Sequence, residues 1–288
     1  MRGEEPCTRS KLSGTFACVG WLDVAPSDEV TFADWIRDRL HPFAKDVSSV
    51  VPTGFSAYAR IFHPAWLRMT DLSSRPAEVR WSEVAKWNGK TVHPEMQFHA
   101  IGGPWQNQPQ GLGPPIYEPH LGVLPEGQSS ELATLLASHT TTPGTCWMCL
   151  WEGYGYVTGA VASLTAWHQS VPWWRRNKLP GIGFGRVRLA LPRRHRPPFP
   201  NRKRVSLPHR DYLLFKGSVH DAQSWEDGPN LWWPGDRAWC VASEIDFQYT
   251  YVGGSSELIE KIVRHPAFEA LPATPADGIT ADSDRINS

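Results

Sequence analysis

The stretch WCVASEIDFQYTYVGGSS, residues 239–256, decides the fold class of this chain. Apolar and polar side chains alternate over Ala238–Gln248, which is typical of a β-strand with one buried face. Two glycines follow, and apolar residues at helical spacing then predict a helix over Ser255–Arg264, which His265-Pro266 ends. The clearest expected unit is therefore a long strand that leads through a short turn into an amphipathic helix.

Shorter elements of both kinds are expected on either side of this unit. Residues 76–89 fit either a strand followed by a turn or a short helix, and both interpretations stay open. Because strands and helices do not alternate regularly, we expect an α+β fold with a mixed, mostly antiparallel sheet, a few short helices and long Pro/Gly-rich loops. The expected helices are Phe32–Leu40 and Glu131–Ser138, and the expected strands are Phe55–Phe62, Cys146–Trp151, Tyr156–Ser163 and Asp211–Lys216.

The length and composition indicate one large domain. The chain has 288 residues, of which 41% are hydrophobic and 20% charged, enough to bury a full core. We expect residues 1–14 and 272–288 to be disordered, and 15–271 to form a single α+β domain with a basic, Pro-rich insertion at about 172–210. Two packed subdomains divided near residue 127 are the alternative. Most of the 15 tryptophans are expected to pack in the core.

Nothing in the sequence indicates a membrane or an oxidising compartment. The first residues are charged and lack the apolar stretch of a secretory signal. The longest weakly polar run, Tyr154–Trp167, is too short and too rich in small polar residues to span a bilayer. Five cysteines without framework spacing favour a reduced, cytoplasmic setting.

The segment Pro172–Arg210 concentrates positive charge, with twelve Lys or Arg residues and no Asp or Glu. Tryptophan and phenylalanine lie among the arginines, a combination that nucleic-acid binders use. The sequence pI of about 7.2 argues against nucleic acid as the partner, so this partner is possible but not favoured. An anionic ligand would suit the segment equally, with Arg193 and Arg194 as candidate anion-binding residues.

Glu244 and Asp246 are the candidate catalytic pair. On the expected strand they share one face, about 6.5 to 7 Å apart, where two carboxylates could hold a metal ion or divide the acid and base roles. The simpler interpretation is the solvated polar face of a half-buried strand. Gly253, Gly254 and Ser255 would stand at the start of the helix, where backbone N–H groups can bind an anion, and an ordinary connecting turn is the simpler interpretation.

No sequence motif assigns a cofactor or a metal. The pair Cys146 and Cys149 has no second pair to complete a zinc site, and strand geometry would send the two thiols to opposite faces. Burial as structural residues is therefore expected for both cysteines. Four of the eleven histidines directly precede proline, which indicates turns and element ends.

Five segments resemble a family of uncharacterised actinobacterial proteins. They are Trp239–Ser256, Arg210–Phe215, Pro229–Trp232, Tyr58–Pro64 and Val79–Ala85. The resemblance covers most of the chain apart from both ends and the basic segment. It implies a bacterial cytoplasmic setting and a single co-folded unit, and it implies no activity, cofactor or catalytic residue.

Two functions from different classes stay open. The favoured hypothesis is an intracellular binding or protein-interaction module without catalysis, whose partner is an unknown protein or small molecule, because no recognised catalytic motif occurs. The alternative is an enzyme that acts on a phosphate-bearing or other anionic substrate, with Glu244 and Asp246 as metal ligands or general acid and base. Basic side chains would then steer the substrate toward Gly253–Ser255.

Overall fold

The computed structural model describes residues 24–43, 45–67, 77–102, 114, 116–158, 199–208, 210–225 and 228–287. Its strands are β1 (Ala25–Ser27), β2 (Ala57–Phe62), β3 (Ala65–Leu67), β4 (Glu78–Val79), β5 (Ile116–Tyr117), β6 (Cys146–Trp151), β7 (Val205–Leu207), β8 (Arg210–Gly217), β9 (Leu231–Pro234), β10 (Cys240–Ala242), β11 (Tyr249–Gly254) and β12 (Glu269–Ala273). Its α-helices are α1 (Asp34–Arg37), α2 (Trp81–Trp87), α3 (Phe98–Gly102), α4 (Glu126–Ala137), α5 (Gly155–Thr158) and α7 (Ser256–Arg264).

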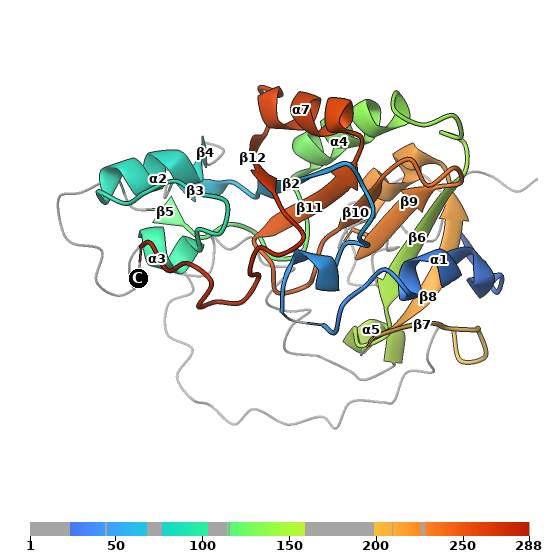
Figure 1. The fold of residues 1–288 in the computed structure, drawn as a ribbon. Helices are drawn as coiled ribbons and strands as arrows, with labels where there is room; N and C mark the ends of the chain where they lie inside the picture. Colours follow the sequence, from blue (N-terminus) through green and yellow to red (C-terminus); the bar gives the residue numbers. More distant parts are fainter. Residues whose placement is uncertain are drawn as a thin grey trace, which may run out of the picture.

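One large antiparallel sheet organises the described part of the chain (Figure 1). Its strand order is β1-β8-β6-β9-β10-β11-β2-β12, and β7 pairs with β8. A small antiparallel sheet, β4-β3-β5, follows the end of β2. These pairings and the accompanying helices confirm the α+β class and the antiparallel arrangement.

Helices cover the large sheet on both faces. Figure 1 shows α4 and α7 next to each other over one face, where Leu132 and Ile262 are among the buried residues of the core. The other face packs against α1, α2 and α3 through buried residues that include Ile36, Trp81 and Ile101. Six of the ten tryptophans that the structure describes are buried in these two cores: Trp81, Trp147, Trp225, Trp232, Trp233 and Trp239.

Helix α2 begins where its own first turn meets strand β12. The backbone N–H of Arg80 donates to the Glu83 carboxylate at 3.0 Å, as in a capping box. The carboxylate of Glu269, on β12, accepts hydrogen bonds from the N–H groups of Trp81 and Ser82. Residues 76–89 therefore contain both a strand and a helix, and Glu269 ties the start of the helix to the large sheet.

Several element predictions agree with the structure. Strand β6 has the predicted bounds, and β8 extends one residue beyond its predicted bounds at each end. Helix α7 begins one residue after its predicted start, and β2 begins two residues after its own. Helix α4 begins five residues earlier than predicted, at Glu126 after Pro125. The predicted helix over Phe32–Leu40 is shorter, a 3-10 turn (Val30–Ala33) followed by α1.

Two strand predictions are wrong. The predicted strand Ala238–Gln248 ends at Ala242, because the chain turns where the Phe247 N–H donates to the Glu244 carbonyl at 2.9 Å and then returns as β11. The predicted strand Tyr156–Ser163 is helical over its first three residues, in α5, and the rest of it lies outside the described residues.

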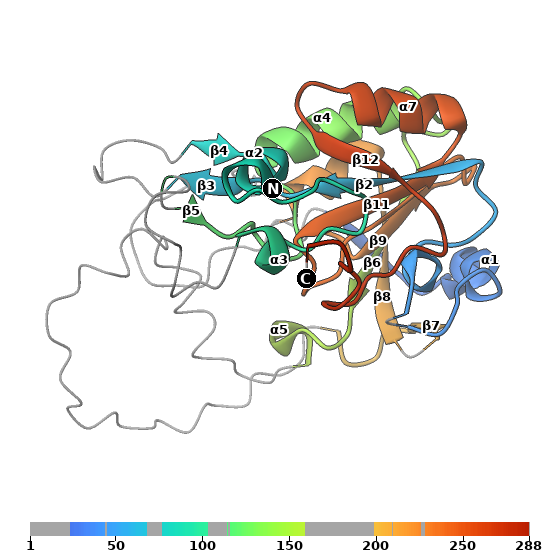
Figure 2. The ribbon, with the colours of Figure 1, turned by 60° about the vertical axis from the view of Figure 1, so that its left-hand side comes forward.

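The C-terminal segment packs against the rest of the molecule, although its small polar composition predicts disorder. Asp284 is buried, accepts from the Gln97 N–H at 3.1 Å and contacts His93 at 2.8 Å. Ile279 is buried in the core, and its carbonyl accepts from the Tyr249 hydroxyl at 3.0 Å. Figure 2 shows the C-terminus beside α3. Polar residues hold this segment through hydrogen bonds, a role that composition does not reveal.

The expected disordered N-terminus, 1–14, lies outside the described residues, as do 172–198 and 209 of the basic insertion. The described end of the insertion is tied to the body, since Arg202 forms an ion pair with Asp28 at 2.9 Å. Within the described ranges, no helix has the length and apolar character needed to cross a membrane.

Candidate functional site

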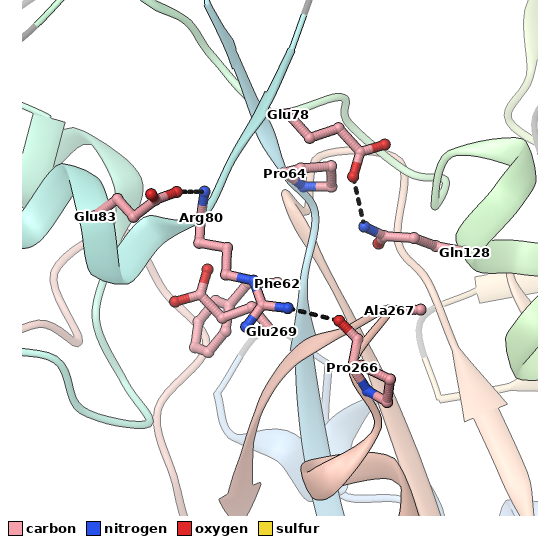
Figure 3. A pocket seen from close by; sticks show the side chains of 9 residues that line it. All are labelled: Phe62, Pro64, Glu78, Arg80, Glu83, Gln128, Pro266, Ala267 and Glu269. Atoms are coloured by element: carbon pink, nitrogen blue, oxygen red, sulfur yellow. Dashed lines mark hydrogen bonds between the residues drawn. The ribbon is translucent and has the colours of Figure 1, made fainter.

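A cavity of about 250 Å³ lies where the small sheet, α2, α4 and β12 meet (Figure 3). We call it the acidic pocket, because three glutamates and one arginine supply its charge. Its lining residues are Phe62, Pro64, Glu78, Arg80, Glu83, Gln128, Pro266, Ala267 and Glu269. With all four groups ionised, the pocket has a formal charge of −2.

The three carboxylates of the acidic pocket are held by neighbouring donors. Glu78, on β4, accepts from the Gln128 side-chain amide at 3.1 Å. Glu83 accepts from the Arg80 N–H, and Glu269 accepts from the first two N–H groups of α2. Carboxylates fixed by backbone N–H groups keep their positions without a ligand, which preorganises the pocket for a positive charge.

Burial raises the pKa of Glu269, while hydrogen bonds from Ser82 and Trp81 and the charge of Arg80 oppose this shift. A raised pKa means that the ionised carboxylate is poorly compensated in its surroundings. A cation that entered the pocket would supply part of the missing compensation. The half-buried Glu269 is therefore the carboxylate that would gain most from a cationic ligand.

Gln128, in the first turn of α4, contributes an unused acceptor. Its side chain is almost fully buried, with 9% exposure, and its Oε1 has no hydrogen-bond partner among the described residues. A flipped amide would place Oε1 against the Glu78 carboxylate, so the hydrogen bond from Nε2 fixes the orientation. An unsatisfied buried carbonyl oxygen is costly, and a donor in the pocket would remove that cost.

Arg80 extends across the acidic pocket toward Pro266 (Figure 3). Its Nη2 donates to the Pro266 carbonyl at 2.6 Å. Within the part of the chain that the structure describes, its guanidinium forms no ion pair with a carboxylate within 4.0 Å. The one cation of the pocket thus lies among three carboxylates without pairing closely with any of them.

No family model matches this chain, and neither a curated protein nor a solved structure is detectably similar to it. The resemblance to actinobacterial proteins therefore stays a prediction, and the chemistry of the site rests on the residues themselves.

The structure separates the predicted catalytic pair. Glu244 is 4% exposed and forms a close ion pair with Arg210, whereas Asp246 is exposed on the turn after β10. The two carboxylates therefore do not share a strand face, and the placement predicted for them is wrong. The alternating polar residues that predicted a strand here belong to the turn after β10, in which Glu244 is buried and Asp246 is exposed.

Groups of the same chain already pair with the buried Glu244 carboxylate. The Tyr212 hydroxyl donates to Glu244 at 3.5 Å, and the Arg210 guanidinium lies between the rings of Phe43 and Trp151, at 3.9 and 4.8 Å. Burial raises the pKa of Glu244 to about 7, although the positive charge of Arg210 acts in the opposite direction. Desolvation is a cost for this buried pair, and the groups that compensate it all come from the chain itself.

The predicted anion seat is packed with apolar side chains. Gly253 and Gly254 belong to β11, and an added Cβ would lie 2.6 Å from Phe55 at Gly253 and 2.8 Å from Leu258 at Gly254. Close packing thus accounts for both glycines. The Ser255 hydroxyl accepts from the Leu258 N–H at 3.2 Å and caps α7. Arg193 and Arg194 lie outside the described residues.

A buried chain of hydrogen bonds joins Ser243, Thr250 and His63. The two hydroxyls are 2.6 Å apart, the Thr250 hydroxyl is 2.9 Å from His63 Nε2, and His63 Nδ1 is 2.7 Å from the His120 carbonyl. Burial lowers the pKa of His63 to about 4, so the ring is neutral. The cavity beside Ser243 holds about 20 Å³, enough for one water molecule, so this chain serves to join strands.

Other predicted chemistry is also accounted for by packing. Cys146 and Cys149 are buried and free, and burial raises the pKa of both thiols, which makes them poor nucleophiles. No cluster of three potential metal ligands occurs among the described residues. Arg60 is fully buried, donates to the Pro94 carbonyl at 2.5 Å and lies 3.6 Å from the ring centre of Tyr249, a cation–π contact within the core.

The residues of the acidic pocket are far apart in the sequence and form no motif. They come from positions 62 to 269, and the bonds from Ser82 to Glu269 and from Gln128 to Glu78 join distant segments. The one local signal is Glu83, which stands three residues after Arg80 as a capping glutamate does.

Proposed function

We propose that this protein is a non-catalytic protein-interaction module that receives a cationic side chain of a partner protein in the acidic pocket. The observation that carries this proposal is the excess of fixed carboxylates over cations in a cavity that also contains the unsatisfied Gln128 oxygen. Positive charge with N–H donors is the ligand chemistry that suits such a lining.

The size of the acidic pocket supports a single side chain as the ligand. Its volume of about 250 Å³ falls below the range of roughly 300 to 1,000 Å³ that is common for sites of drug-sized molecules. Phe62 and Pro64 provide an apolar wall for the methylene stem of a long basic side chain. A Lys or Arg side chain meets both requirements.

A binding role also fits what the lining residues already do. Glu83 and Glu269 accept backbone hydrogen bonds that support helix α2, so proton transfer by either would disturb the fold. The alternative enzyme, with Glu244 and Asp246 as its acid and base, lacks support from geometry because Glu244 is buried against Arg210 while Asp246 is exposed on the following turn. A reducing cytoplasmic setting is part of the proposal, supported by the free thiols of Cys146, Cys149 and Cys240.

Binding of a minimal cationic probe tests the proposal. We expect Nα-acetyl-arginine N-methylamide to bind, as measured by calorimetry or by amide chemical shifts around α2, and the neutral citrulline analogue not to bind. Glu78→Gln should weaken binding about threefold or more, because one exposed carboxylate is neutralised. Glu131→Gln, an exposed residue on α4 outside the lining, is the matched control. Equal binding of both probes would refute the proposal.

A further inference from the structure

Arg80 places its guanidinium in the acidic pocket on a neutral acceptor, the Pro266 carbonyl, rather than on a carboxylate. Arg80 directly precedes α2, and its side chain reaches across the pocket and ends on the Pro266 carbonyl. That carbonyl precedes β12 and lies on the opposite wall from Glu83. A single neutral acceptor therefore holds the guanidinium, although three carboxylates line the same cavity.

An exposed arginine in this position gains little from staying. A hydrogen bond to one carbonyl contributes a small net free energy, and a long side chain loses rotamer entropy when it is fixed. Glu83 stands three residues after Arg80, the spacing at which side chains on a helix surface meet. Glu83 lines the wall of the pocket opposite the Pro266 carbonyl, so Arg80 has an alternative partner there, and its guanidinium could leave that carbonyl without leaving its charge unpaired.

We propose that Arg80 is a resident stand-in for the ligand: its guanidinium marks the place that an arginine of the partner protein takes when Arg80 moves to Glu83. This inference rests on the proposed function and names the ligand group and the control of the same site. The arriving guanidinium takes over the Pro266 carbonyl and comes within reach of Glu269 and Gln128.

Arginine fits this set of acceptors better than lysine does. The guanidinium is planar and carries five N–H donors in a fixed fork, whereas an ammonium is a compact point charge. The acceptors come from separate walls of the pocket: the Pro266 carbonyl, the Glu269 carboxylate and the Gln128 Oε1. A planar group with several donors can serve all three at once.

The direction in which one substitution changes the affinity for the arginine probe tests the inference. Arg80→Gln removes the stand-in and changes the formal charge of the pocket from −2 to −3, so the arginine probe should bind about three- to tenfold more tightly than to wild type. The lysine probe, Nα-acetyl-lysine N-methylamide, should gain less. Arg264→Gln is the matched control: it removes an exposed arginine of α7 that does not line the pocket, and it should change binding less than twofold.

The outcomes separate the inference from the proposed function. If wild type binds the arginine probe and Arg80→Gln binds it equally or more weakly, the stand-in role is wrong while the cationic site stands. If neither protein binds any cationic probe, the proposed function fails and the stand-in role fails with it. Binding by Arg80→Gln alone would support both, because it would show that Arg80 blocks the site. Amide spectra of both variants confirm that the fold is retained.

Discussion

The Glu244–Arg210 pair and the acidic pocket both combine glutamate with arginine, but they differ in whether the charges are paired within the chain. At Glu244 the carboxylate is buried, pairs directly with Arg210, and the arginine is enclosed by Phe43 and Trp151. In the acidic pocket Arg80 is exposed, and its guanidinium meets a carbonyl while three carboxylates remain without a close cation. At the first site the carboxylate is paired with a cation of the same chain. The second site has more negative than positive charge, which a further cation would reduce.

This difference shows that a strongly shifted pKa does not by itself identify a binding site. Burial raises the pKa of Glu244 to about 7, the kind of shift that often accompanies function. Its partners nevertheless come from the same chain, which is typical of a structural pair. The acidic pocket has milder shifts, but it has volume, excess charge and an unsatisfied acceptor.

The largest expected effect comes from removing one cation at each site. Arg210→Met leaves Glu244 buried without its partner, which should lower the free energy of unfolding by about 4 kcal/mol. Arg80→Met should change it by less than about 0.5 kcal/mol, because Arg80 is exposed. Urea denaturation of both variants provides the measurement. Equal losses of stability at the two sites would contradict the difference between them. Recovery of stability in the double variant Arg210→Met/Glu244→Gln would show that the loss comes from the unpaired Glu244 carboxylate.

The pH dependence of stability offers the next effect. The pKa of Glu244 is about 7 in the fold against an ordinary 4.5, so its contribution to stability is present below pH 4.5 and lost as the pH rises to 7. His63 has a folded pKa of about 4 against 6.5, so its contribution is present above pH 6.5 and lost as the pH falls to 4. Each contribution amounts to about 3 kcal/mol, and the two oppose each other.

Glu244→Gln should therefore expose the His63 contribution. Wild type should change little in stability between pH 4.5 and 6.5, whereas the variant should gain about 2 kcal/mol over the same interval. Denaturation curves at three pH values measure this slope. Parallel pH profiles for wild type and variant would show that Glu244 stays ionised through its contact with Arg210.

A smaller effect is expected where the acidic pocket meets α2. Glu269→Ala removes the acceptor of two backbone N–H groups and should lower the free energy of unfolding by about 2 kcal/mol. Glu78→Ala, at an exposed position, should cost less than about 0.5 kcal/mol. Hydrogen exchange at Trp81 and Ser82 would locate the change. Unaltered protection there would mean that Glu269 does not support the helix.

The sequence predicts features that depend on neighbouring residues, and it does not predict sites that depend on contacts between residues far apart in the chain. Helix α7 and strand β6 were predictable because periodicity is a local property of the chain. The turn after β10 was not, because Glu244 faces inward only when Arg210 is there to receive it. The acidic pocket has no local signature at all beyond Glu83, since tertiary contacts between remote segments create both its shape and its unused acceptor.

The smallest expected effect on stability separates binding from folding within the acidic pocket. Gln128→Leu removes the buried, unsatisfied Oε1 and also the hydrogen bond to Glu78, so the two changes should nearly cancel, within about 1 kcal/mol. Binding of the arginine probe should nevertheless fall several-fold, because an acceptor on one wall is lost. Calorimetry and urea denaturation on the same preparation measure both quantities. A variant that is destabilised by several kcal/mol would show that Gln128 is held for the fold; unchanged binding in a stable variant would show that its oxygen never meets the ligand.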